Sequence, residues 1–269
     1  MSSSYIDAHC HLADPRLQDI LPETLRRAQE KHIHTFVQGG VGPEDWQRQR
    51  KLLEKYGECI VPCFGLHPWW VAERDLEENL QAISILEENL NDSVGVGEIG
   101  LDFGRRFGEE TYPVQETIFV KQLEIAQKVN KPIVLHLVRC HPRAITLLKL
   151  HGVPSCGGIV HAFGGSLDIA KAYIDMGLSI SLGGICTRPG YKKLKRAITE
   201  LPLERIVLES DSPDLAPYSW GKRLNEPVSL LEVAQEVSVL RGCRSDELLH
   251  CASENVRRIF GLAERVVDS

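Results

Sequence analysis

Histidine and carboxylate side chains recur at the ends of short apolar runs in this chain of 269 residues. Imidazole and carboxylate groups held at strand ends are the donors that a divalent-metal site needs. Because six candidates come from five separated strands, the sequence predicts two metal ions and hydrolytic chemistry. The candidate metal ligands are His9, His11, Glu98, His136, His161 and Asp211.

The motif D-A-H-C-H places two histidines two residues apart on an extended run. Alternation along a strand turns His9 and His11 to one side and Cys10 to the other. Two imidazoles placed in this way can reach one ion at about 2.1 Å. A pair of ordinary core or surface histidines has the same spacing, so this motif alone leaves both interpretations open.

The motif V-G-E-I-G-L-D places Glu98 at the end of an apolar run that is rich in glycine. A buried carboxylate is costly unless it is paired or bound to a metal. Gly95, Gly97 and Gly100 allow an ion or other backbone to approach closely. An arginine pair at a barrel mouth is the alternative, but the H-x-H motif beside it favours the metal.

Three further candidates each follow an apolar run. A single histidine after a strand is more often structural, but His136 and His161 occupy the same relative place on successive strands. Asp211 ends the last predicted strand, where it could complete a metal shell and accept a proton from a metal-bound water. A helix N-cap or an ion pair is the alternative for Asp211. Glu209 shares its face but lies deeper, so we expect a supporting role.

The elements that must position these residues alternate between apolar strands and helical periodicities. Pro22, Pro142 and Ser245 mark expected helix starts, with Ser245 as an N-cap. Eight strands at a spacing of roughly 30 residues are typical of a parallel (β/α)8 TIM barrel. The expected strands are Tyr5-Ile6, Ile33 to Val37, Ile60 to Gly65, Val94 to Gly97, Ile133 to Leu135, Gly158 to Val160, Leu178 to Leu182 and Ile206 to Leu208.

A doubly wound open sheet would show the same alternation of strands and helices. The eight repeats, and polar motifs after many strands rather than at one crevice, favour the barrel. We therefore expect an α/β fold in which residues 1–269 form a single barrel domain. The metal site is expected at the C-terminal mouth of the strands.

Composition limits the partners and the location. The formal net charge of -6 argues against a broad grip on duplex nucleic acid, but not against binding one strand end. The 8 cysteines lack a C-x-x-C pair and are expected to be reduced thiols. No leader pattern precedes the first strand, and no apolar stretch approaches the ~20 residues of a membrane span. We expect a cytoplasmic protein without an obligate protein partner.

Several motifs together resemble a known family. D-A-H-C-H-L, G-L-H-P at residues 65–68, G-E-I-G-L-D, the strand-borne His136, H-A-F-G-G and E-S-D-S-P resemble the ordered motifs of TatD-type metal-dependent hydrolases. The resemblance spans nearly the whole chain. It implies a TIM barrel of the amidohydrolase superfamily, in which several TatD members are deoxyribonucleases.

Carried over by position, the resemblance implies two ligand sets that share Glu98. It places one ion among His9, His11, Glu98 and Asp211. It places the other ion among Glu98, His136 and His161, so that Glu98 bridges the two. The mixed donor set suits Zn, Mn or Co, and suits Mg less well because Mg prefers oxygen ligands.

Substrate contacts are less clearly marked. The family often has an arginine two residues after the fifth-strand histidine, where this chain has Val138 followed by Arg139. Arg139 is our candidate for a phosphate contact. His67 could donate a hydrogen bond to a phosphate oxygen or brace its loop. The pair Trp69-Trp70 could stack on a base, although a buried loop anchor is the favoured interpretation.

The resulting hypothesis is a two-metal phosphodiesterase, namely a 3′–5′ exonuclease on single-stranded DNA. The ions would lower the pKa of a bridging water to form hydroxide, Asp211 would take or orient its proton, and Arg139 or Arg105 would neutralise phosphoryl charge. A basic group near the seventh and eighth strands could guide the nucleic acid, although a solvated helix face is favoured for its first four members. The group comprises Lys192, Lys193, Lys195, Arg196, Lys222 and Arg223.

Two other functions remain as alternatives. A metal-dependent lactonase or amidohydrolase acting on a small carbon-centred ester or amide would need the same ligands. A binding protein with a vestigial site is disfavoured, because all six ligand positions are filled.

Overall fold

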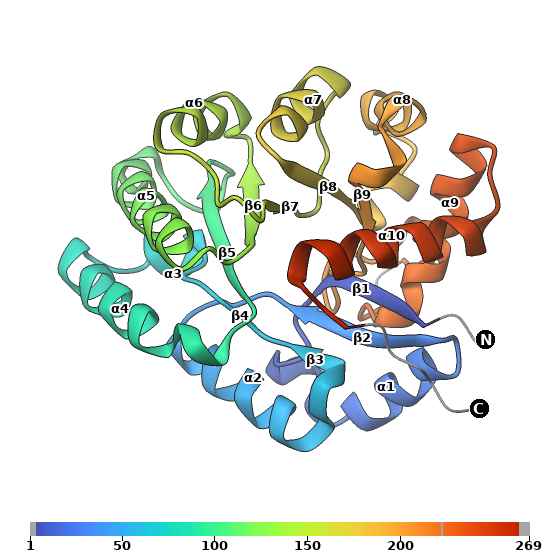
Figure 1. The fold of residues 1–269 in the computed structure, drawn as a ribbon, viewed down its shortest axis with the longest axis horizontal. Coiled ribbons are helices and arrows are strands. Elements are labelled where there is room, and N and C mark those ends of the chain that lie inside the picture. The colour runs from blue at the N-terminus through green and yellow to red at the C-terminus, as the bar shows by residue number, and fades with distance from the viewer. Residues whose placement is uncertain (1–3, 222, 264–269) are drawn as a thin grey trace.

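The structure is a computed structural model that describes residues 4–221 and 223–263. Lys222, one of the basic residues named above, lies outside the described residues. Figure 1 shows central strands surrounded by helices. The strands are β1 (Tyr5–Cys10), β2 (Ile33–Gln38), β3 (Ile60–Val61), β4 (Cys63–Phe64), β5 (Gly95–Asp102), β6 (Ile133–Val138), β7 (Gly158–Val160), β8 (Leu178–Leu182) and β9 (Ile206–Leu208).

The strands are parallel and follow chain order, as β1-β2-β3 and as β4 through β9. The third expected strand is divided into β3 and β4 at Pro62, which has no N–H to donate to a ladder. β1 and β5 continue past their expected ends to Cys10 and Asp102, so His9 and Glu98 lie within strands and His11 directly follows β1.

Backbone hydrogen bonds close the strands into a barrel. At the seam between the two ends of the chain, the N–H of Asp211 donates to the carbonyl of His9 at 3.0 Å, and that of His11 donates to Ser212 at 2.6 Å. Beyond β2, the N–H of Gly40 donates to the carbonyl of Gly97 at 2.9 Å and joins the two sheets. The predicted TIM barrel is therefore confirmed.

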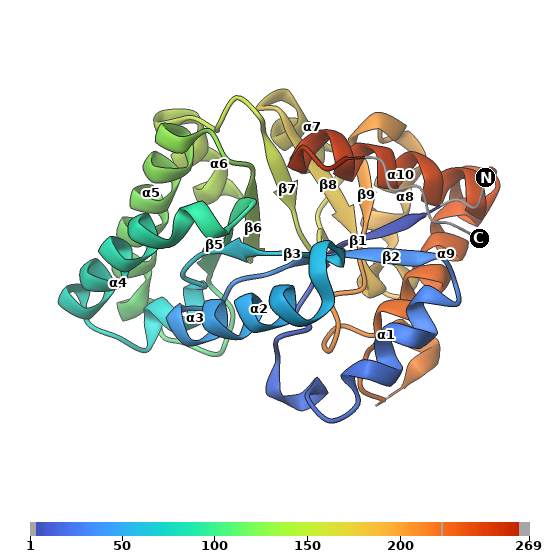
Figure 2. The same cartoon turned by 60° about the horizontal axis from the view of Figure 1, so that its bottom comes forward.

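The helices form an outer layer around the strands (Figure 2). None among the described residues is long and apolar enough to cross a bilayer. They are α1 (Leu21–Gln29), α2 (Pro43–Tyr56), α3 (Pro68–Ala72), α4 (Leu76–Asn89), α5 (Tyr112–Val129), α6 (His141–His151), α7 (Leu167–Asp175), α8 (Lys192–Glu200), α9 (Leu230–Arg241) and α10 (Ser245–Phe260).

The predicted helix starts are confirmed at two of three places. Pro22 and Pro142 lie in the first turns of α1 and α6. The prediction that Ser245 caps α10 was wrong, because the helix begins one residue earlier than expected. Ser245 is its first helical residue, while Arg244 is the extended N-cap and makes no side-chain capping bond. The Arg244 guanidinium pairs instead with Asp246 in the first turn.

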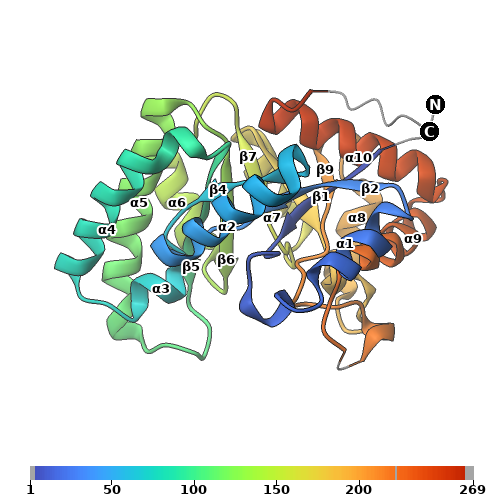
Figure 3. The same cartoon turned by 90° about the horizontal axis from the view of Figure 1, so that it is seen from below.

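α10 packs across the N-terminal end of the barrel. Its Val256, Ile259 and Phe260 belong to a buried apolar cluster with side chains from β1, β2, β6, β7 and β9. The Asn255 side chain donates to the carbonyl of Ile206 at 2.8 Å, at the start of β9. Figure 3 shows the loops after β1 and β5 at the end of the barrel away from α10. The apolar end of the interior is thus sealed, and the opposite end carries the polar residues.

Candidate metal centre

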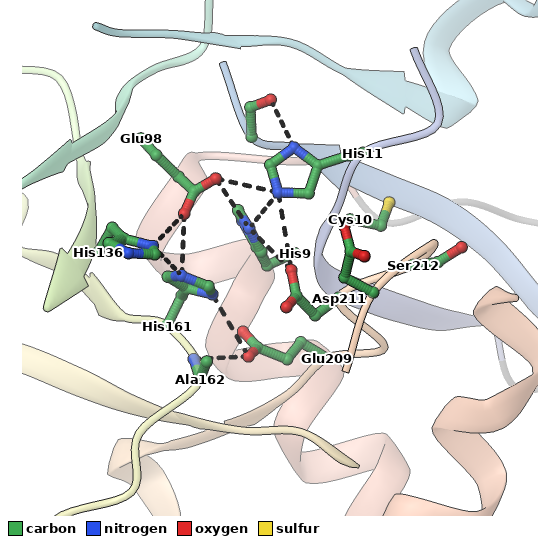
Figure 4. Close-up of polar contacts among 12 residues, drawn as sticks. His9, Cys10, His11, Glu98, His136, His161, Ala162, Glu209, Asp211 and Ser212 are labelled. Atoms are coloured by element: carbon green, nitrogen blue, oxygen red, sulfur yellow. Dashed lines mark hydrogen bonds and ion pairs between the residues drawn. The ribbon is translucent and has the colours of Figure 1, made fainter. Parts of the chain in front are cut away.

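All six predicted ligands meet at the carboxyl ends of the strands (Figure 4). Five of them are buried, and the side chain of His11 is 17% exposed. They arrive from both ends and the middle of the chain, because parallel strands bring their carboxyl ends to one rim. The positions are His9 on β1, His11 directly after β1, Glu98 on β5, His136 on β6, His161 after β7 and Asp211 after β9.

The carboxylate of Glu98 lies between two histidine pairs, with one oxygen facing each pair. Its Oε2 lies 3.0 Å from Nε2 of His11 and 3.4 Å from Nε2 of His9. Its Oε1 lies 2.8 Å from Nε2 of His161 and 3.3 Å from Nδ1 of His136. This arrangement allows one carboxylate to bridge two ions.

The spacing of the donor atoms fits shared cations. The Nε2 atoms of His9 and His11 lie 3.2 Å apart, and Nδ1 of His136 lies 3.1 Å from Nε2 of His161. Ligand atoms about 2.1 Å from one tetrahedral ion stand roughly 3.4 Å from each other. Within the described chain, buried Oε2 of Glu98 also accepts no hydrogen bond, which is costly unless a cation is bound there.

Asp211 completes the first of these sets. Its Oδ1 lies 3.5 Å from Nε2 of His9 and 3.6 Å from Nε2 of His11. The three residues offer donor atoms that all lie within 4.8 Å of one another. They therefore could hold one ion together with Oε2 of Glu98, as the family resemblance implies.

Groups behind the imidazoles fix their orientation. Nδ1 of His11 lies 3.1 Å from the carbonyl of Gly39, whereas Nδ1 of His161 lies 3.6 Å from Oε1 of Glu209, near this carboxylate but beyond hydrogen-bond distance. Glu209 in turn accepts hydrogen bonds from the N–H of Ala162 at 2.6 Å and from the hydroxyl of Ser181. Such outer partners orient metal-binding histidines and raise their basicity. The expected supporting role of Glu209 agrees with this position.

Sequence reasoning missed two carboxylates that contact the cluster. Asp102 lies behind His136, with Oδ2 at 3.3 Å from Nε2. Asp7 ties β1 to the last strand by accepting the N–H of Ser210 at 2.9 Å and that of His9 at 3.3 Å. Their places in D-A-H-C-H and G-E-I-G-L-D, an even number of residues from the ligands, could have indicated them.

The electrostatics of the cluster suit cation binding. Burial works to raise the pKa of Glu98, but His161, His9 and His11 hold it well below its usual range. Burial works to lower the pKa of His11, but Glu98 and Asp211 raise it to about 9. Burial raises the pKa of Asp211 despite the nearby histidines. Metal binding must displace protons from these groups and is therefore pH-dependent.

His67 reaches the cluster and also braces its loop. Its Nδ1 accepts the backbone N–H of Trp69 at 3.0 Å, at the N-cap of α3. Its Nε2 lies 3.2 Å from Nδ1 of His136. Burial holds the pKa of His67 well below its usual value. A neutral imidazole that accepts at Nδ1 carries its proton on Nε2, so this proton points toward the cluster.

Of the predicted cations, Arg139 lies at the rim and four others lie on α8. Arg139 follows β6, three residues after His136, and its side chain is exposed. Lys195 pairs with Glu236 at 2.5 Å on the half-buried side of α8. Lys192, Lys193 and Arg196 are exposed on the same helix, in keeping with the solvated face favoured above.

A barrel that gathers imidazoles and carboxylates at this rim is a metal-dependent hydrolase of the TIM-barrel type. The chain belongs to the family described as TatD related DNase, whose model matches residues 6–261. The family, the fold and the hydrolase class predicted from the sequence are confirmed.

Relatives match the chain over almost its full length. It is 31% identical over 255 residues to the uncharacterized metal-dependent hydrolase YabD of Bacillus subtilis, covering 94% of this chain and 98% of that protein. It is 27% identical to human deoxyribonuclease TATDN3, covering 95% and 94%. The crystal structure of the Escherichia coli TatD homologue YjjV superposes with a TM-score of 0.88 at 30% identity, covering 98% and 100%.

Proposed function

We propose that this protein hydrolyses phosphodiester bonds at two divalent ions, as a 3′–5′ exonuclease on single-stranded DNA. The observation that carries the proposal is the division of the Glu98 carboxylate between two histidine pairs. Divalent ions held by these two sets of residues would supply a water of lowered pKa and would stabilise charge on the phosphoryl oxygens.

The proposed ligand sets are those implied by the resemblance, and the donor atoms fit them. His9, His11 and Asp211 would hold one ion with Oε2 of Glu98, while His136 and His161 would hold the other with Oε1. Imidazole nitrogens outnumber carboxylate oxygens in the second set, which favours Zn, Mn or Co over Mg.

The chain's own groups supply proton transfer and charge stabilisation. Asp211 faces the Nε2 atoms of both His9 and His11, so its carboxylate would lie beside a water held at that ion and would accept its proton. Nε2–H of His67 is aimed at the cluster and would donate to a phosphoryl oxygen. Arg139 at the rim would offset the charge of the phosphate.

DNA as the substrate is supported by the names of the relatives. The matching family is described as DNase, and human TATDN3 as a deoxyribonuclease. A net charge of -6 disfavours tight, extended binding of a duplex. A strand end that reaches a recessed centre requires few phosphate contacts, which suits an exonuclease.

The test uses metal-free protein reconstituted with Mg²⁺, Mn²⁺ or Zn²⁺ and an end-labelled single-stranded DNA oligomer. A Glu98→Ala variant is prepared in the same way. We expect a metal-dependent ladder that starts from the 3′ end and is absent in the variant. Two bound ions without cleavage of DNA would contradict the proposal, and cleavage of a lactone or an amide by the same protein would support the alternative hydrolase.

A further inference from the structure

Two adjacent tryptophans, Trp69 and Trp70, follow the G-L-H-P motif at the start of α3, and only Trp69 lies beside the cluster. Its ring centre is 4.9 Å from that of His67 and 5.9 Å from that of His136. The residue is 36% exposed. The buried-anchor interpretation favoured from the sequence therefore fails for Trp69.

The neighbouring Trp70 is the anchor. Its ring lies against the backbone of Gly42, where an added Cβ would stand 2.6 Å from the indole. Arg74 covers the ring at 3.8 Å and donates to the carbonyl of Trp70 at 2.9 Å. Trp70 thus fastens α3 to the loop before α2.

The ring of Trp69 is held rigidly although it is partly exposed. Its backbone N–H donates to Nδ1 of His67 at 3.0 Å, and its indole N–H donates to Oδ2 of Asp102 at 2.5 Å. Asp102 is itself fixed by the N–H of Gly104 at 2.7 Å. An aromatic ring that is fixed at its polar edge and exposed elsewhere loses little entropy when a planar ligand stacks on it.

A cation lies over this ring. The guanidinium of Arg106 stands 4.2 Å from the ring centre of Trp69. Its ion pair with Glu73 is 3.5 Å long, and both side chains are about half exposed. Exposed pairs of this kind contribute little, so Arg106 can leave its place when a ligand arrives.

We propose that Trp69 and Arg106 form a subsite for the nucleobase of the nucleotide whose phosphodiester is cleaved. The base stacks on the indole and takes the place of the guanidinium, and Arg106 moves to a phosphate of the same strand. The inference rests on the proposed function. It adds that the site prefers nucleoside esters over alkyl esters, and that it accepts every base, because stacking tolerates sequence.

The test compares two esters with the same leaving group, thymidine 5′-(4-nitrophenyl phosphate) and methyl 4-nitrophenyl phosphate. Trp69→Ala should raise KM for the thymidine ester about tenfold and leave KM for the methyl ester unchanged, since one stacked base is lost. Trp69→Phe should retain most of the affinity. Arg106→Ala should weaken binding of a short deoxythymidine oligomer, which offers further phosphates of the same strand, whereas Arg74→Ala, its matched control over Trp70, should change neither this binding nor the two KM values.

Other outcomes would overturn the subsite. An equal rise in KM for both esters, or a fall in kcat for both with loss of bound metal in Trp69→Phe, would mean that Trp69 only supports Asp102 and His136. Binding of a short deoxythymidine oligomer to Glu98→Gln protein, measured by fluorescence anisotropy, does not require turnover. An unchanged Kd after Trp69→Ala in that background would exclude the subsite even if the wild-type protein cleaved neither ester.

Discussion

The two histidine pairs that face Glu98 differ in what stands behind them. His136 and His161 come from different strands, and each has a carboxylate near its far nitrogen. Asp102 is within hydrogen-bond distance of His136 at 3.3 Å, whereas Glu209 lies 3.6 Å from Nδ1 of His161, too far for a hydrogen bond. His9 lies on β1 and His11 directly follows it, and no carboxylate of the described residues pairs with the Nδ1 atom of either. Nδ1 of His11 faces a carbonyl, and buried Nδ1 of His9 has no hydrogen-bond partner in the described chain.

His9 and His11 instead face a carboxylate on the side of the cluster, at their Nε2 atoms. Asp211 faces both Nε2 atoms from the segment after β9, across the seam where the barrel closes. A carboxylate on the inner side can take part in proton transfer, whereas one behind an imidazole can only orient and polarise it. We therefore expect the half of the centre that contains Asp211 to perform proton transfer. We expect the half that contains His136 and His161 to bind its cation without taking part in that transfer.

The largest expected effect is loss of the bridge. Glu98→Ala removes the carboxylate that both halves share, so we expect kcat/KM to fall at least about a thousandfold and metal content to fall below that of the wild type. Metal analysis by mass spectrometry and DNA cleavage measure the two effects. Glu87→Ala, at an exposed glutamate on α4, is the control. Full metal content and activity in Glu98→Ala would show that the two histidine pairs do not share Glu98 as a metal ligand.

Asp211→Asn tests the half at the seam. The amide cannot accept the proton of the attacking water, so kcat should fall by roughly 10²–10⁴. The ion held by His136 and His161 should remain bound. Steady-state kinetics with metal analysis of the same preparation separate the two effects, and an unchanged kcat would assign proton transfer to another group.

Asp102→Asn tests the opposite half. His136 and Trp69 hold the pKa of Asp102 at about 2 against the effect of burial, so the wild-type side chain is a charged partner for His136. Its loss should weaken one metal-binding step by roughly 10–100-fold and leave the other unchanged. Calorimetric metal titration resolves the steps. Equal weakening of both steps would show that Asp102 supports the whole rim.

Asp7 should produce the smallest effect, through the pH dependence of stability. Burial raises its pKa to about 8, although hydrogen bonds from Ser210 oppose this. The folded state therefore keeps a proton that the unfolded state loses near its ordinary pKa of about 4. The stability contributed by this proton is full below about pH 4 and is lost as pH rises toward about 8.

Asp7→Asn cannot ionise and should not show this loss. Urea unfolding of metal-free protein from about pH 5 to about pH 9 should show the variant gaining free energy of unfolding relative to the wild type as pH rises. Parallel pH curves for the two proteins would mean that Asp7 is already ionised in the folded state at neutral pH.

The six candidate ligands could be predicted from the sequence because their positions follow two simple rules. Strand alternation groups His9 with His11, and parallel strands bring their carboxyl ends to one rim. The division at Pro62 was also accessible, since a proline inside a strand interrupts its ladder. These features depend on local sequence and on one rule of topology.

The remaining features depend on contacts between distant segments. The bond from Trp69 to Asp102 joins α3 to the end of β5, and the sequence of neither segment specifies the other. Trp69 lies exposed beside the cluster whereas Trp70 packs against Gly42. This difference follows from the orientation of α3, which no pattern in the sequence predicts. α10 begins at Ser245 after Arg244, an N-cap that makes no side-chain capping bond, so the residue types at this boundary do not indicate where the helix begins.

If Glu98 bridges two ions held by unlike halves, anomalous diffraction from crystals of zinc-loaded protein should show both ions. We expect two peaks, one among His9, His11 and Asp211 and one between His136 and His161, with an oxygen of Glu98 on each. A single peak, or two peaks of which one lacks Glu98, would contradict this expectation.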